Sequence, residues 1–160
     1  MPATDHPQPC SSVQVEVEVT INASPARVWR ALVSETPTWW HPEFYTIAEP
    51  RKFILEPRLG GRAYEDGGDG TGLTWFTIVG VAPEKSLHLV GHLFPGWGGP
   101  AVSMVKIILE PEDAAGSATR VKLRDALIGD VTDKTAGTMR EGWTMLLADA
   151  LKPHVERNGA

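Results

Sequence analysis

Alternation of apolar and polar residues predicts a β-strand near the start of the chain. From Val13 to Ile21 every second residue is aliphatic, and the residues between them are polar or acidic. Because side chains alternate between the two faces of a strand, this segment buries one face and exposes the other. Ser24 then stands where a helix cap is needed, and Pro25 suits the first helical position. We therefore expect a strand, a short helix, and one more helical turn that ends at Pro42.

Between residues 51 and 128 the pattern changes to short runs of β-forming residues separated by turn clusters. The turns are rich in Gly, Pro and Asp, and their lengths are those of hairpin loops. Six antiparallel strands in a meander are therefore predicted. They cover residues 53–55, 62–64, 73–81, 87–93, 102–109 and 119–128.

The last segment has helical periodicity. Apolar residues recur at three- and four-residue steps from Met139 to Val155, which predicts a helix over about 132–154 that Pro153 kinks or ends. An antiparallel sheet must cover its apolar face, and this helix alone has the length to do so. The predicted fold class is therefore α+β, with a seven-stranded curved antiparallel sheet wrapped on one long C-terminal helix and two short helices after the first strand. A space between sheet and helix makes such a fold a pocket former.

Composition narrows the functional classes. The chain has 160 residues, a net charge of −5 and a single cysteine, Cys10, which excludes a disulfide framework and a cysteine-based metal cage. Its acidic balance argues against nucleic-acid binding, and we expect no cofactor and no metal. Residues 1–12 are expected to form a disordered N-terminal tail, and residues 13–156 a single domain. No segment is long and apolar enough for a membrane span or a signal peptide, so the expected compartment is the cytoplasm.

Six short motifs follow one another along almost the whole chain. They are Ile21–Leu32, Trp39–Pro42, Glu56–Arg62, Val81–Pro83, Leu109–Pro111 and Gly142–Trp143. In this order and spacing the chain resembles the SRPBCC superfamily, which has the Bet v 1-like or START-like helix-grip fold. Within it, the chain is similar to the branch of the C-terminal domain of the activator of Hsp 90 ATPase. The resemblance implies the fold, but that fold carries lipid binding, polyketide cyclisation, hydrolysis and co-chaperone work.

One position departs from the pattern of these relatives. Many of them end the last strand in Thr-His-(Ser/Thr)-Gly, whereas this chain reads Leu123 to Leu127, with Asp125 in place of the histidine. Chemistry that depends on that imidazole therefore does not transfer. Asp125 and the histidines are the remaining candidates for acid–base work, and Arg124 is available to pair with a carboxylate. The alternative interpretation of Asp125 is structural, as a strand end that bonds to the backbone.

Two histidines lie four residues apart on a predicted strand. At about 3.3 Å per residue the rings of His88 and His92 are about 13 Å apart, which is too far to share a metal ion. Trp75 and Phe76 are adjacent on another predicted strand and should face opposite sides. Trp97 lies between glycines in a loop, where it either covers the pocket mouth as a lid or folds back onto the core.

Five of the six tryptophans fall on segments that border the predicted pocket, and the neighbours Trp39 and Trp40 should point in different directions. We expect ligand binding by ten residues and catalysis by none. The ten are Trp29, Trp40, Trp75, His88, His92, Phe94, Trp97, Asp125, Trp143 and Leu147.

The first functional hypothesis is a non-catalytic protein that binds a small hydrophobic or aromatic molecule, such as a lipid. The resemblance implies an alternative, a protein-interaction module with a chaperone as its partner. A cyclase- or hydrolase-like enzyme on the same fold is the third hypothesis. The chain is expected to be a monomer or a homodimer.

Overall fold

A computed structural model of the chain describes residues 9–49 and 51–158. Seven strands form one antiparallel sheet in the order β1-β7-β6-β5-β4-β3-β2. The strands are β1 (Ser11–Ile21), β2 (Lys52–Leu55), β3 (Arg62–Asp66), β4 (Gly72–Ala82), β5 (Ser86–Leu93), β6 (Ala101–Pro111) and β7 (Thr119–Gly129). The first strand of the chain thus pairs with the last, and the predicted seven-stranded sheet is confirmed.

The sheet begins slightly earlier than the sequence pattern predicts. Ser11 pairs with Gly129 and Ser12 with Ile128, so both serines belong to β1 rather than to a tail. Residues 1–8 of the predicted disordered tail lie outside the described residues.

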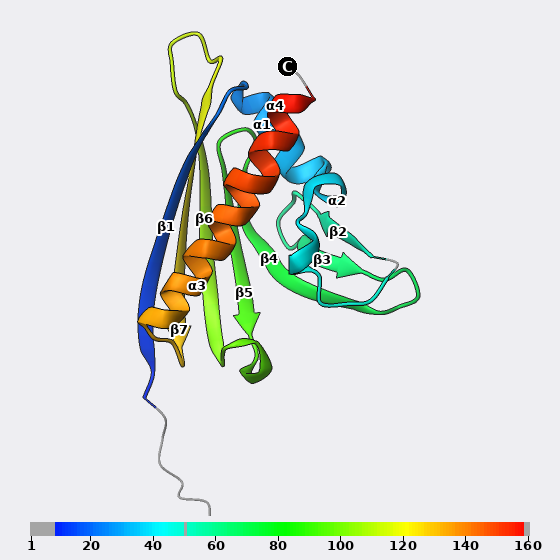
Figure 1. Ribbon diagram of the computed structural model, residues 1–160, viewed down its shortest axis with the longest axis vertical. Helices are drawn as coiled ribbons and strands as arrows, with labels where there is room; N and C mark the ends of the chain where they lie inside the picture. The colour runs from blue at the N-terminus through cyan, green and yellow to red at the C-terminus, as the bar shows by residue number, and fades with distance from the viewer. Residues whose placement is uncertain (1–8, 50, 159–160) are drawn as a thin grey trace, which may run out of the picture.

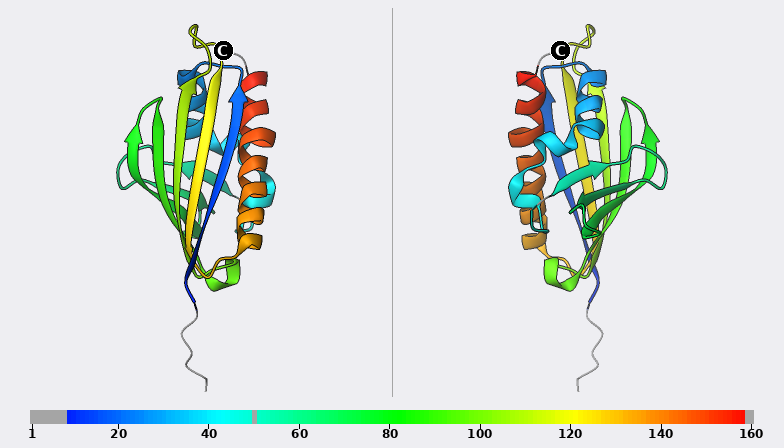
Figure 2. Two further views of the ribbon diagram at one scale, coloured as in Figure 1. Left: turned by 90° about the vertical axis from the view of Figure 1, so that its left-hand side faces the viewer. Right: turned by 90° about the vertical axis from the view of Figure 1, so that its right-hand side faces the viewer.

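A long helical segment crosses the concave face of the sheet (Figures 1 and 2). It consists of α3 (Asp133–Thr144), a π-helical stretch, η3 (Met145–Leu151), and α4 (Lys152–Arg157). Thr132 caps it in a capping box with Thr135. Pro153 does not end the helix: it is the second residue of α4, just after the π-helical stretch. A proline ring obstructs the ordinary i→i−4 pattern, and the wider turn accommodates it.

Two short helices close one end of the molecule. Ser24 accepts a hydrogen bond from the Arg27 backbone N–H and begins α1 (Pro25–Ser34), as predicted. The following α2 (Thr36–Trp39) has Pro37 in its first turn, where the missing N–H costs nothing. A 3₁₀ turn, η1 (Pro42–Phe44), leads from there toward β2. Figure 1 shows α1 and α2 beside the C-terminal half of the long helix, whereas η1 reaches α3, where Phe44 lies near Gly142.

The core lies between the sheet and the helices. Fully buried side chains from both layers meet there, including Val15, Ile78, Leu87, Leu123, Leu147 and Leu151. Their alternation along the strands follows the period-2 pattern of the sequence. Beside the C-terminal half of α3 this filling gives way to a cavity.

Candidate binding cavity

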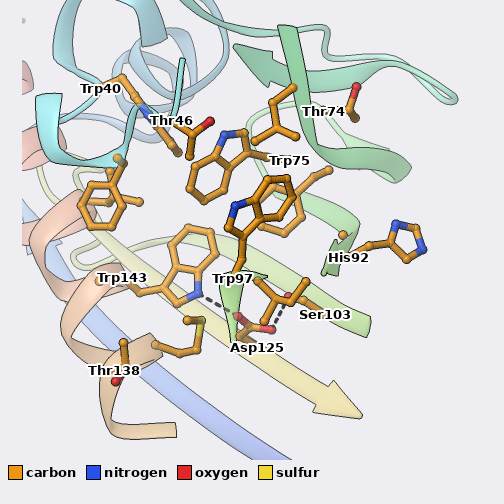
Figure 3. Close-up of a pocket in the computed structure, with 18 residues that line it drawn as sticks. Trp40, Thr46, Thr74, Trp75, His92, Trp97, Ser103, Asp125, Thr138 and Trp143 are labelled. Atoms are coloured by element: carbon orange, nitrogen blue, oxygen red, sulfur yellow. Dashed lines mark hydrogen bonds between the residues drawn. The ribbon is translucent and has the colours of Figure 1, made fainter. Parts of the chain in front are cut away.

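A cavity of about 280 Å³ lies between the concave face of the sheet and α3. Its wall comes from strands β4 to β7, from α3, and from the turns around Phe44 and Trp97. Six of the eighteen residues that line the cavity are tryptophans and phenylalanines: Trp40, Phe44, Trp75, Phe76, Trp97 and Trp143. Figure 3 shows the four tryptophans among them. A second hollow of about 30 Å³, about the share of one water molecule in the liquid, adjoins the first. The two share the lining residues Trp40, Phe76, Trp143 and Leu146.

The two adjacent tryptophans after α1 diverge, as predicted. Trp39 turns into the core and donates its indole N–H to the Ala31 carbonyl oxygen (2.8 Å). Trp40 lines the cavity and stacks on Phe53, with 3.5 Å between ring centroids. It also meets Trp75 edge to face, at 5.9 Å. This cluster joins the helical end of the molecule to the sheet and forms one wall of the cavity.

The prediction that Trp75 and Phe76 face opposite sides is wrong. Ala63 pairs with Phe76 and Tyr64 with Thr74, so Trp75 is an extra residue in β4 opposite β3. A β-bulge of this kind interrupts the alternation of faces. Both aromatic side chains therefore border the same cavity.

Asp125 is the buried charged group of the cavity wall. It lies on β7 with its side chain directed inward and is 1% exposed. Ser103 Oγ donates to its Oδ1 (2.6 Å), and Trp143 Nε1 donates to its Oδ2 (2.9 Å). Burial raises the pKa of the carboxyl, and these two hydrogen bonds oppose that rise. The carboxyl group is thus held in a fixed position between β6 and α3.

The expected pairing of Arg124 with this carboxyl group does not occur. Arg124 is the next residue on the strand, so it points to the outer face, where it forms an ion pair with Glu16. Among the described residues that line the cavity there is no lysine or arginine. The negative charge of Asp125 has neutral hydrogen-bond donors around it and no cation.

A second buried carboxylate, Glu65, was not predicted from the sequence. It does not line the cavity but bonds to residues that do. Glu65 is 0% exposed and accepts hydrogen bonds from the backbone N–H of Thr46 (2.6 Å) and from Trp75 Nε1 (3.1 Å). Its side chain follows the buried Ala63 by two residues, and this spacing places an acid on the inner face of β3. An acidic residue at an inward-facing strand position is the feature of the sequence that could have identified Glu65. Glu65 fixes two of the cavity-lining residues.

The structure brings six of the ten predicted site residues to the cavity and leaves four elsewhere. Those at the cavity are Trp40, Trp75, His92, Trp97, Asp125 and Trp143. Those elsewhere are Trp29, His88, Phe94 and Leu147. The role of all ten residues in ligand binding stays a prediction.

The four residues away from the cavity have identifiable surroundings. Trp29 packs on the core from α1, and Leu147 is buried in that core beside the smaller hollow. His88 alternates with the inward Leu87 and Leu89, so it lies on the outer face, opposite Lys106. An acid–base pair of Asp125 and His88 is therefore not assembled. Phe94 is 62% exposed in the turn after β5.

Two residues mark the boundary between the cavity and solvent. Trp97 lines the cavity while 47% exposed, and its ring meets Phe94 edge to face at 5.5 Å. It belongs to a 3₁₀ turn, η2 (Pro95–Trp97), that ends at Gly98 with a left-handed backbone (φ 91°). His92 is exposed, and in Figure 3 its ring points away from the other labelled side chains. Trp97 thus covers part of the opening and is itself exposed to water.

Over residues 9–49 and 51–158 no group of three His, Cys, Asp or Glu residues could hold a metal ion. In the same part of the chain no helix is long and apolar enough to cross a membrane.

Comparisons with known proteins agree with this architecture. The sequence profile of the family described as "Activator of Hsp90 ATPase homolog 1-like protein" matches residues 22–156. No curated protein matches the chain in sequence. Structural similarity extends to protein CV1439 from Chromobacterium violaceum, with 20% identity, a TM-score of 0.66, and coverage of 89% of this chain and 96% of that one.

Two further solved structures share the fold at lower identity. Ara h 8.0201 has 14% identity and a TM-score of 0.65, over 92% of this chain and 99% of that one. Norcoclaurine synthase from Thalictrum flavum, in complex with dopamine and hydroxybenzaldehyde, has 12% identity and a TM-score of 0.63, over 94% of this chain and 90% of that one. At these identities the likeness shows the fold alone, and it confirms the Bet v 1-like architecture that the sequence predicts.

Proposed function

Since the chain belongs to the family of Activator of Hsp90 ATPase homolog 1-like proteins, we propose that it uses the cavity of this fold to bind a small hydrophobic molecule. The proposal is for binding without catalysis. The observation that carries it is the cavity itself, about 280 Å³ of space walled by aromatic rings. Protein interiors are normally packed without such voids, so a space of this size in a small domain calls for an occupant.

The size of the cavity limits the ligand. Ligand pockets usually enclose about 300–1,000 Å³, whereas a cavity of about 150 Å³ already takes benzene. A volume of about 280 Å³ therefore suits a molecule of one or two rings better than a long-chain lipid. Burying about 200 Å² of apolar ligand surface contributes about 5 kcal/mol before the costs of association.

Two observations support an aromatic ligand and a binding role. Aromatic rings line the wall, and such rings favour stacked and edge-to-face contacts with a planar molecule. Norcoclaurine synthase, a chain of the same fold, was solved with the one-ring molecules dopamine and hydroxybenzaldehyde. Among the described lining residues only Asp125 and the outward-pointing His92 are acidic or basic, which leaves Asp125 without an acid–base partner in the cavity.

Two glycines of α3 provide a test with a matched control. Gly142 lines the cavity, and a Cβ there would meet Phe44 at 3.4 Å. Gly137 lies on the same helix with open space around it. Gly142→Leu should fill the cavity and weaken binding of the neutral fluorescent probe N-phenyl-1-naphthylamine at least about tenfold, since each tenfold corresponds to about 1.4 kcal/mol. Gly137→Leu should bind the probe like the natural protein.

Fluorescence titration measures the affinities, and native mass spectrometry of the purified protein should recover a bound small molecule. Circular dichroism verifies that both variants fold. Unchanged probe binding in Gly142→Leu would place the probe outside this cavity. Absence of probe binding in the natural protein, together with empty native mass spectra, would contradict the proposed function.

The family match favours a second candidate, an interaction with an Hsp90-type chaperone. Exposed apolar side chains on the outer face, Val102, Met104 and Ile128, offer a surface that is separate from the cavity. Co-precipitation with the purified chaperone separates the two candidates, because Gly142→Leu should leave such an interaction unchanged.

A further inference from the structure

The charge at Asp125 is not balanced within the cavity. Ser103 and Trp143 are its hydrogen-bond donors, and both are neutral. Neutral donors satisfy lone pairs, but they leave a net negative charge in a wall that is otherwise apolar. His92 is the other titratable lining residue, and its ring points away from this site (Figure 3). The side chain of Arg124 lies on the other face of the sheet.

The carboxylate also keeps capacity to accept further hydrogen bonds. An ionised carboxylate offers about four lone-pair sites, and each oxygen of Asp125 receives one hydrogen bond from the protein. Asp125 is 1% exposed, so a group bound in the cavity reaches the remaining sites only through the narrow edge that this residue presents in the cavity wall. The site therefore suits a ligand group that donates hydrogen bonds.

The surroundings of the carboxylate favour a donor that is also a cation. Trp143 touches the carboxylate through its indole N–H, and Phe76 lies 6.0 Å from the Trp143 ring. Trp97 lines the same cavity. The faces of aromatic rings attract a cation, whose charge is also neutralised by the carboxylate. An anionic ligand would be repelled there, and an uncharged one would leave Asp125 unbalanced.

We propose that the cavity selects molecules in which a protonated amine is attached to an aromatic ring system, with the ammonium group on Asp125 and the rings against the aromatic wall. This inference rests on the proposed function, because it names the class of ligand for the same cavity. It assigns Asp125 the role of a charged anchor.

Three probes of nearly equal shape test the inference: 2-(1-naphthyl)ethylamine, 2-(1-naphthyl)ethanol and 1-naphthylacetate. Isothermal titration calorimetry at pH 7 should give the amine an affinity at least about tenfold higher than that of the alcohol, as expected when a hydrogen bond to a charged group is added. The carboxylate probe should bind more weakly than the alcohol. Asp125→Asn should bring the amine and the alcohol to within about threefold of each other.

Glu16→Gln is the matched control. It also removes one carboxylate from the sheet, but on the exposed outer face, where Glu16 pairs with Arg124. It should leave all three affinities unchanged. Equal affinities of the amine and the alcohol for the natural protein would overturn the inference while leaving the proposed function intact, and this comparison does not depend on any variant. Failure of all three probes, and of the neutral fluorescent probe, would overturn both.

Discussion

Asp125 and Glu65 are both buried carboxylates at the cavity, and they differ in how their charges are compensated. Glu65 receives hydrogen bonds from the backbone N–H groups of Thr46 and Ile47, from the Thr46 hydroxyl and from the Trp75 indole. Asp125 receives two. A buried charge is tolerated when its hydrogen bonds are complete, so Glu65 supports the fold, whereas Asp125 is held at a cost to stability.

Asp125→Asn tests how the charge of this buried side chain affects the stability of the protein. Its side-chain amide can donate to Ser103 while its oxygen accepts from Trp143, so the variant keeps both contacts without the charge. Because burial raises the pKa of Asp125 in the folded protein, the unfolded chain ionises first as the pH rises through about 3.9. The natural protein therefore loses stability relative to the variant above that pH.

Thermal unfolding of both proteins between pH 3 and pH 8 measures the effect. The variant should match the natural protein at the acidic end and exceed it at pH 8, by roughly the 1–3 kcal/mol that an incompletely compensated buried group costs. The same change at Glu65, Glu65→Gln, should have the opposite sign, because its amide would face hydrogen-bond donors. An Asp125→Asn protein that is less stable than the natural one at pH 8 would refute this account.

At the scale of elements, one glutamate connects both ends of the chain. Glu35, between α1 and α2, accepts from Arg27 (3.2 Å) and contacts His154 Nε2 on α4 at 2.6 Å. Burial raises the pKa of Glu35, but the hydrogen bond with His154 and the charge of Arg27 outweigh it, so the pKa is lowered. This contact holds the C-terminal part of the long helix against the two short helices.

Glu35→Gln should lower the free energy of unfolding by about 1–3 kcal/mol at pH 7, since it weakens hydrogen bonds to charged groups. A lowered pKa in the folded state stabilises the protein above the ordinary glutamate value of about 4.3, and this stabilisation is lost as the pH falls through the folded pKa. The difference between the two proteins should therefore shrink as the pH is lowered from 7 toward 3.

Urea denaturation at several pH values checks this prediction. Glu110→Gln is the control, because it removes a surface ion pair with Lys122 that should contribute less than about 1 kcal/mol. A loss in Glu35→Gln that is the same at pH 3 and pH 7 would mean that packing, rather than charge, connects these elements.

For the whole molecule, the folding core and the cavity share Trp40, Phe76 and Leu146, but each also has side chains of its own. Leu147 and Leu151 are buried where the helix meets the sheet and the short helices. The cavity lies beside the C-terminal half of α3, and its wall includes the half-exposed Trp97. Stability and binding should therefore respond to different substitutions.

Leu147→Ala should cost about 2–5 kcal/mol of stability, as large-to-small changes in a core do. Trp97→Ala should weaken binding of N-phenyl-1-naphthylamine severalfold, with a loss of stability below about 1 kcal/mol, because this side chain is 47% exposed. Denaturation and titration of both variants measure the two effects. Equal losses of stability would show that the cavity wall and the core form one unit.

The sequence by itself determined the elements, their order and the family. The alternation in β1 and the helical period after Met139 are relations between near neighbours, so they can be read without a structure. The sequence also indicated aromatic residues around one pocket. The predicted opposite orientation of Trp75 and Phe76 was wrong, because a bulge depends on pairing with another strand.

The tertiary structure alone decided which side chains meet. The contact of Asp125 with Ser103 and Trp143 joins β7, β6 and α3, and the hydrogen bonds of Glu65 join β3, β4 and the segment after η1. Such contacts depend on how the sheet curves around the helix, and no local periodicity encodes that curvature. The pattern of residues therefore predicted a pocket, whereas the packing of distant elements placed a single uncompensated charge inside it.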